Sequence, residues 1–153
     1  MSQMNPLVPP PVIVIILAAG MWAADRTFAS LTLDAGVLAP LALLVFAAGL
    51  LLLIASVVSF IKARTSINPL RPANASHLIT TGVFSFSRNP IYLADLLLLD
   101  AWALWLGNII NVLFILTFLW YIQRFQIVPE EQALQRLFGA RYADYCTRVR
   151  RWL

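Results

Sequence analysis

The 153-residue chain has few charged residues: lysine, arginine, aspartate and glutamate make up 12% of it, whereas hydrophobic residues make up 61%. This scarcity of charge, with a mean hydropathy of +0.81, excludes an ordinary soluble domain. The sequence also has a single cysteine, Cys146, so it can form no internal disulfide. Its length permits one compact unit, and we expect residues 1–153 to form a single membrane-embedded domain.

Basic residues outnumber acidic ones, 11 to 7, which gives a formal charge of +4. A basic surplus of this kind can indicate nucleic-acid binding. Here, however, the basic residues flank apolar runs, as expected for residues that contact lipid headgroups and set membrane topology. The sequence therefore predicts a lipid bilayer, and no nucleic acid, as the partner of the chain.

Four apolar runs are predicted to form transmembrane helices, at about residues 7–24, 37–61, 90–106 and 109–128. A run such as the second is long enough to cross a hydrocarbon core of about 30 Å with some tilt. No lysine or arginine precedes the first run, which argues against a cleaved signal peptide. The predicted fold is all-α: a polytopic membrane protein with about four transmembrane helices and interfacial helices over residues 129–153.

The distribution of lysine and arginine predicts the orientation. Between the second and third runs lie Lys62, Arg64, Arg71 and Arg88, and after the fourth lie Arg136, Arg141, Arg148, Arg150 and Arg151. Between the first and second runs the basic residue is Arg26. The positive-inside rule then places both termini and the 62–89 loop in the cytosol. Two motif-rich segments, at residues 77–92 and 130–149, would share that face of the membrane.

The C-terminal segment combines acidic, aromatic and basic residues, in the order Glu130-Glu131, Leu134, Phe138-Gly139, Tyr142, Tyr145 and Arg148-Val149. Pro129 suits the first turn of a helix, so we expect a new helix or a kink there. Gly139 suits the end of that helix. Tyr142, Tyr145, Val149 and Trp152 are spaced as one face of a short terminal helix. An amphipathic tail with interfacial aromatic residues is one interpretation of this pattern.

The earlier segment runs from Thr81 through Arg88-Asn89-Pro90-Ile91-Tyr92 and opens the third apolar run. Together the two segments resemble the isoprenylcysteine carboxyl methyltransferase / phospholipid methyltransferase family of integral-membrane enzymes, over about residues 62–153. The resemblance implies an S-adenosylmethionine-dependent methyltransferase without a metal ion. It would yield S-adenosylhomocysteine and methylate an amphipathic or apolar acceptor at the cytosolic face. A prenylcysteine carboxylate, a phospholipid amine, a small thiol and a quinone-like hydroxyl all remain open as acceptors.

The resemblance also implies roles for individual residues. Carboxylates accept hydrogen bonds from a ribose diol, and aromatic rings stack on adenine or face a sulfonium cation. The residues implied in cofactor binding are His77, Leu78, Gly82, Arg88, Asn89, Pro90, Tyr92, Glu130, Glu131, Tyr142 and Tyr145. Arg148 is implied as a catalytic residue that orients a substrate carboxylate. Asn89 replaces the family's common histidine and cannot titrate near neutral pH, and Ala94 stands where a glycine is frequent.

Other residues leave alternatives open. Asp95 and Asp100 lie within the third run, where ionised acids are costly and frequently functional. An ion pair between Asp95 and Arg124 is one interpretation, and a ligand-binding role for either residue is the other. Gly49 is typical of close helix packing. For the whole chain the alternatives are an NADPH-dependent membrane sterol/enone reductase-like protein and a non-enzymatic scaffold that binds anionic lipid.

Overall fold

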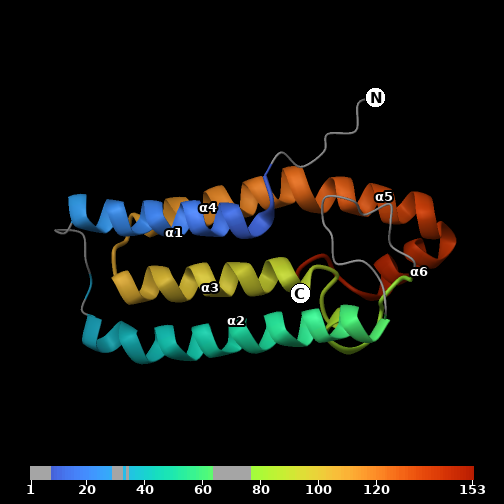
Figure 1. Ribbon diagram of the computed structural model, residues 1–153, viewed down its shortest axis with the longest axis horizontal. Helices are drawn as coiled ribbons and strands as arrows, with labels where there is room; N and C mark the ends of the chain where they lie inside the picture. The colour runs from blue at the N-terminus through green and yellow to red at the C-terminus, as the bar shows by residue number, and fades with distance from the viewer. Residues whose placement is uncertain (1–7, 29–32, 34, 64–76) are drawn as a thin grey trace.

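The computed structural model describes residues 8–28, 33, 35–63 and 77–153, and the regular elements within them are helices. This confirms the all-α prediction. Figure 1 shows the helices of the bundle lying side by side along its long axis, with the last helices of the chain at one end. The elements are α1 (Pro10–Thr27), α2 (Ala35–Ala63), the short 3-10 helix η3 (Gly82–Ser85), α3 (Pro90–Leu106), α4 (Asn111–Ile122), the π-helical turn η4 (Gln123–Ile127), α5 (Val128–Phe138) and α6 (Ala140–Arg148).

Among the described residues, three helical segments are long and apolar enough to cross a membrane: Pro10–Thr27, Gly36–Ala63 and Asn111–Phe138. Many of their large apolar side chains point away from the protein, and Ile15, Leu51 and Leu113 are each at least 60% exposed. In water such surfaces would be unfavourable, whereas lipid tails are a compatible solvent for them. Helices whose backbone groups are satisfied internally and whose outer surfaces are apolar are those of an integral membrane protein.

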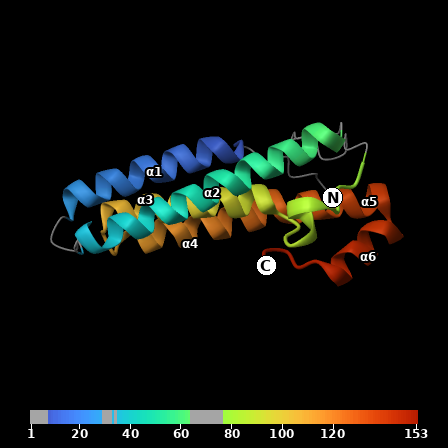
Figure 2. The same cartoon turned by 90° about the horizontal axis from the view of Figure 1, so that it is seen from below.

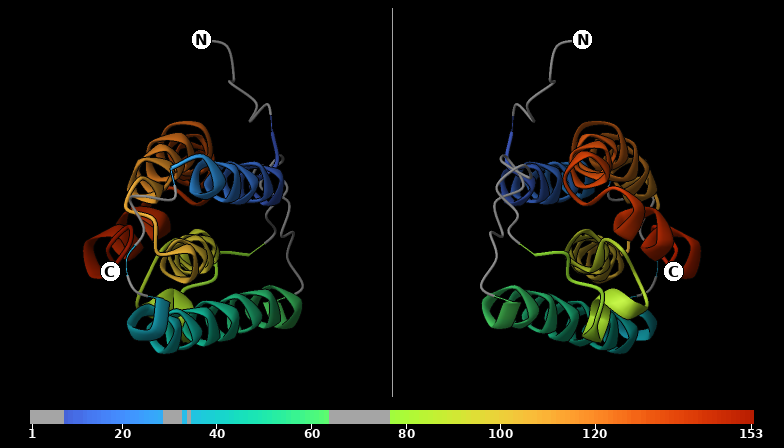
Figure 3. Two further views of the ribbon diagram at one scale, coloured as in Figure 1. Left: turned by 90° about the vertical axis from the view of Figure 1, so that its left-hand side faces the viewer. Right: turned by 90° about the vertical axis from the view of Figure 1, so that its right-hand side faces the viewer.

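Helix α3 occupies the centre of the bundle. Seen end-on in Figure 3, it lies between α2 on one side and α1 and α4 on the other. Pro90 stands in its first turn and Gly107, with a left-handed φ of 68°, ends it, so its bounds match the predicted 90–106. Its 17 residues extend over about 25 Å. The topology of four spans stays a prediction, because α3 is shorter than the three segments above.

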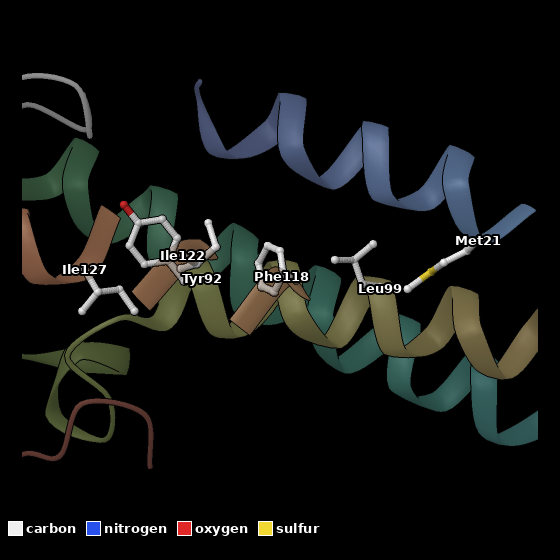
Figure 4. Packing of buried hydrophobic residues seen from close by; sticks show 6 residues of the cluster. All are labelled: Met21, Tyr92, Leu99, Phe118, Ile122 and Ile127. Atoms are coloured by element: carbon white, nitrogen blue, oxygen red, sulfur yellow. The ribbon is translucent and has the colours of Figure 1, made fainter. Parts of the chain in front are cut away.

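The core of the bundle is built between α1, α3 and α4 and continues into the π turn. Figure 4 shows the buried cluster Met21, Tyr92, Leu99, Phe118, Ile122 and Ile127. Most of its members are aliphatic or sulfur-containing, and the Tyr92 hydroxyl lies at one end of the cluster. In a bilayer such contacts stabilise helix association through close packing, since lipid tails are as apolar as the core.

Gly49 allows α2 to approach α3 closely, as the sequence predicted. A Cβ atom at this position would lie 3.0 Å from the Leu97 Cβ and 3.3 Å from the Ala94 carbonyl oxygen. Ala94 is itself fully buried. The backbone of Ala94 therefore faces α2, and this departure from the family pattern falls at the α2–α3 contact.

The helix that begins with α4 continues through η4 into α5, so Pro129 stands in the first turn of α5 without interrupting the segment Asn111–Phe138. The π turn buries Gln126 and Ile127 and leaves Arg124 exposed. Asp95 is buried, and none of the three ion pairs found among the described residues includes Asp95 or Arg124. Of the two interpretations of these residues, the Asp95–Arg124 ion pair is therefore wrong. The π turn that contains Arg124 departs from the regular 3.6-residue period on which that interpretation relied.

The chain turns back after α5 (Figure 2). Gly139, with φ 51°, separates the two helices, as predicted. Helix α6 ends at Arg148 because Val149 is extended, with φ −124° and ψ 130°. Tyr142, Tyr145 and Val149 pack together, whereas Trp152 packs against the core of the bundle. The prediction that these four residues share one helical face is thus wrong at Trp152. In Figure 2 the chain returns from α6 toward the start of α3.

Candidate active site

Both motif segments meet at one end of the bundle, where η3, the start of α3, the start of α5 and α6 come together (Figure 1). Pro90 fixes where α3 begins, and Pro129 stands in the first turn of α5. The residues just before and after these two prolines therefore lie side by side. We define residues 149–153, which follow α6 and return to this place, as the C-terminal tail.

Glu130 and Tyr92 join the starts of α5 and α3. The Tyr92 hydroxyl donates a hydrogen bond to Glu130 Oε2 at 3.1 Å, and the tyrosine is only 5% exposed. Among the described residues, no other side chain donates a hydrogen bond to the Glu130 carboxylate. The structure thus brings together two residues that the sequence assigned to one pocket.

Glu131 lies between two arginines. Its Oε1 is 3.0 Å from Arg88 Nη2 and accepts from Arg151 Nε at 3.1 Å, and its Oε2 accepts from Arg151 Nη2 at 2.7 Å. Two parallel bonds from one guanidinium make the Arg151 contact bidentate, which is the strong form of this interaction. The hydrogen bond to Glu131 is also the main reason why the pKa of Arg151 is raised. Arg88 was predicted here, whereas Arg151 was not.

The C-terminal tail is bound to the start of α3 through its backbone. The Arg88 amide donates to the Arg150 carbonyl at 3.1 Å, and the Asn89 side chain donates to the Arg151 carbonyl at 2.9 Å. Asn89 stands at the N-cap of α3 but makes no capping bond with its side chain. The side-chain amide of Asn89 therefore donates a hydrogen bond to the C-terminal tail. This role does not need a side chain that titrates, such as the histidine common in the family. The Ser87 hydroxyl oxygen accepts a hydrogen bond from the backbone N–H of Asn89 at 3.1 Å; the sequence did not predict Ser87 as a site residue.

Tyr142 and Tyr145 hold α6 against the rest of the site. Both are buried, and they pack with Val149 and with Leu78, another residue assigned to the pocket. The Tyr145 hydroxyl donates to the Phe84 carbonyl at 2.6 Å. Burial raises the pKa of Tyr145 to about 12. The pKa of Tyr142 is also raised, mainly by burial and secondly by the negative charge of Glu131.

The remaining predicted residues lie at the edge of this arrangement. The Arg148 side chain is 65% exposed and pairs with Asp144 at 2.6 Å, so it is not brought to the paired glutamates. His77 is exposed at the start of a described segment, and Gly82 opens η3 with φ 64°. The sequence did contain a signal for Arg151, because three arginines stand at 148, 150 and 151. Which of these arginines reaches Glu131 depends on where α6 ends.

The sequence pattern of the phospholipid methyltransferase family matches residues 37–141, which is more than half of the 153 residues. The chain belongs to the phospholipid methyltransferase family. It is also 48% identical to an uncharacterised protein of Haemophilus influenzae over 63 residues, which are 41% of this chain and 100% of that relative. No solved structure matches the chain.

The glutamates, arginines and tyrosines gathered at the polar end of the bundle make this end the place to test for the methyl donor that phospholipid methyltransferases generally use. S-Adenosylmethionine carries a ribose diol, an adenine and a charged amino-acid end. Glu130 has acceptor capacity beyond its bond with Tyr92. The buried Nε of Arg88 has no hydrogen-bond partner within the described residues, and an oxygen acceptor of a ligand would satisfy it. The donors and acceptors present here therefore fit this cofactor.

Proposed function

We propose that the protein transfers a methyl group from S-adenosylmethionine to an amphipathic or apolar acceptor at the cytosolic face of the membrane. Family membership supports the methyltransferase class. The observation that carries the proposal for this chain is the contact between Tyr92 and Glu130 at the joined starts of α3 and α5. A carboxylate oriented by a buried phenol is ready to accept the ribose hydroxyls.

The residues of the site divide the work of binding. Glu130 accepts hydrogen bonds from the cofactor, and Arg88 offers its free Nε–H to a carboxylate or another oxygen group. The bound cofactor supplies an electrophilic methyl group, so the protein has to position the acceptor and exclude water. Tyr142 and Tyr145 close the site on the side of α6. His77, Gly82, Asn89 and Pro90 complete the proposed cofactor side.

An acceptor that contains both apolar and polar parts suits the position of this end of the bundle. Large apolar side chains cover the outer faces of α1 and α2 along their length, so lipid reaches the bundle sideways. Arg148 is the proposed contact for an anionic acceptor, which would approach it from the water-exposed side of α6. Methyl transfer from radiolabelled S-adenosylmethionine, assayed against lipid extracts and against small thiols, identifies the acceptor class.

The proposal is tested by calorimetric titration of the detergent-purified protein with S-adenosylhomocysteine and, separately, with NADPH. We expect S-adenosylhomocysteine to bind, and Glu130→Gln to weaken that binding by about 1.5–3 kcal/mol, the range for hydrogen bonds to charged groups. Asp144→Asn, which removes an exposed carboxylate of α6, is the matched control and should bind normally. Binding of NADPH alone would favour a reductase, and binding of neither compound would favour a scaffold.

A further inference from the structure

The two adjacent glutamates of the site are not equivalent. A carboxylate offers about four lone-pair positions to hydrogen-bond donors. Glu131 accepts two hydrogen bonds from Arg151 and forms an ion pair with Arg88, whereas Glu130 accepts one hydrogen bond, from Tyr92. Within the described residues both oxygens of Glu131 therefore have protein partners, and Glu130 keeps most of its acceptor capacity for a ligand.

The second arginine of Glu131 comes from the C-terminal tail and is held there on both sides. Its own carbonyl accepts the Asn89 side chain at 2.9 Å, and the preceding carbonyl, of Arg150, accepts the Arg88 amide at 3.1 Å. The following residue, Trp152, packs against the buried cluster that contains Tyr92. These contacts hold the backbone of Arg151 beside the start of α3, and from there its guanidinium reaches Glu131.

The charges of this cluster depend on one another. The side chains of Arg88 and Glu131 are 14% and 18% exposed, and that of Arg151 is 35% exposed. In such a partly buried place Glu131 would be costly without cations, and the two arginines would repel each other without Glu131. Removing one member consequently changes the positions of the other two. Because Glu131 adjoins Glu130, such a change reaches the ligand-facing carboxylate.

We propose that Arg151 is a positioning residue of the cofactor site. With Arg88 it holds Glu131, and this three-residue clamp fixes the start of α5 so that Glu130 faces the ligand beside Tyr92. The C-terminal tail is thereby part of the site, although it lies beyond the segment matched by the family pattern. This inference rests on the proposed function, because the ligand is the methyl donor or its product.

The test is a double-mutant cycle on the full-length protein in detergent, with the affinity for S-adenosylhomocysteine as the measured quantity. Arg151→Ala and Glu131→Gln should each weaken binding roughly tenfold or more, the scale of a lost charged hydrogen bond. Arg151→Ala should have little further effect in the Glu131→Gln background, because both changes disrupt one clamp. Arg151→Lys, which keeps the charge but loses the planar fork, should bind with intermediate affinity.

Arg150→Ala is the matched control, since it removes an equal charge from the tail while its carbonyl still accepts the Arg88 amide. It should change the affinity less than about twofold, as is usual for an exposed side chain. The inference is overturned if Arg151→Ala binds like Arg150→Ala, or if the effects of Arg151→Ala and Glu131→Gln simply add. If Arg151→Ala does not fold, the same comparison is made with Arg151→Lys. Failure of the wild-type protein to bind would instead overturn the proposed function.

Discussion

At the scale of single residues, identical side chains at neighbouring positions acquire different roles. Glu130 receives a phenol hydroxyl and Glu131 receives two guanidiniums. Arg148 pairs with Asp144 in water-exposed surroundings, whereas Arg151, three positions later, reaches Glu131. The sequence predicted that the glutamates and Arg88 belong together. It could not rank the arginines, because their difference lies in the backbone at Val149.

Tyr145 gives a prediction of pH dependence. Burial raises its pKa to about 12 from an ordinary value of 10.0. Between pH 10 and 12 the folded protein keeps a proton that the unfolded chain loses, so stability is unaffected below pH 10 and falls above it. The expected slope is about 1.4 kcal/mol per pH unit. Melting temperatures of the detergent-solubilised protein should fall less steeply in this range for Tyr145→Phe.

The same variant also loses the hydrogen bond to Phe84, which should lower its stability at every pH by about 1 kcal/mol. The two effects separate because only one of them changes with pH. Parallel curves for the wild type and Tyr145→Phe between pH 10 and 12 would contradict the assignment of the alkaline slope to this residue.

At the scale of elements, regular helices followed from local sequence and irregular ones did not. Pro90, in the first turn of α3, and Gly139, between α5 and α6, mark helix boundaries as predicted. The π turn over Gln123–Ile127 has no comparable local signal. Its buried Gln126 side chain donates to the Val8 carbonyl at 2.9 Å, a contact between segments distant in sequence. Contacts of this kind cannot be predicted from local periodicity.

The close contact of α2 with α3 predicts that a large side chain at position 49 destabilises the protein. Gly49→Leu should destabilise the protein by about 1–3 kcal/mol, because a Cβ there already meets the Leu97 Cβ at 3.0 Å. Ala48→Leu is the control, since Ala48 is exposed on the lipid side of α2. Its effect should stay within about 0.5 kcal/mol. Thermal unfolding in detergent measures both variants, and equal losses would argue against this helix contact.

At the scale of the whole molecule, the orientation in the membrane remains to be tested. The predicted topology has four spans and a cytosolic site, but Arg64 and Arg71, which contribute to that prediction, lie outside the described residues. The C-terminal end of α1 and helix α6 lie toward opposite ends of the bundle in Figure 1. Thr27 is the exposed last residue of α1, and Arg141 is an exposed residue of α6. They therefore report on the two sides of the membrane.

In a Cys146→Ser background, a membrane-impermeant maleimide should label Thr27→Cys in sealed cells. It should label Arg141→Cys only after the cells are opened. This outcome follows from the excess of arginine and lysine on the side of the motifs. Labelling of Arg141→Cys in sealed cells would show that the site faces outward.

The sequence by itself determined that the molecule is an all-α membrane protein, and it predicted most of the residues that meet in the candidate site. Long apolar runs, bounded by proline and glycine, specify helices in lipid because the signals are local. Tertiary structure alone decided that Arg151 binds Glu131 and that Asn89 donates to the tail. It also decided that Arg124 is exposed while Asp95 is buried. These partners are separated by between 20 and 62 residues where they are bonded. Such pairings depend on how helix ends and a π turn set the direction of the chain, which no local pattern of residues encodes.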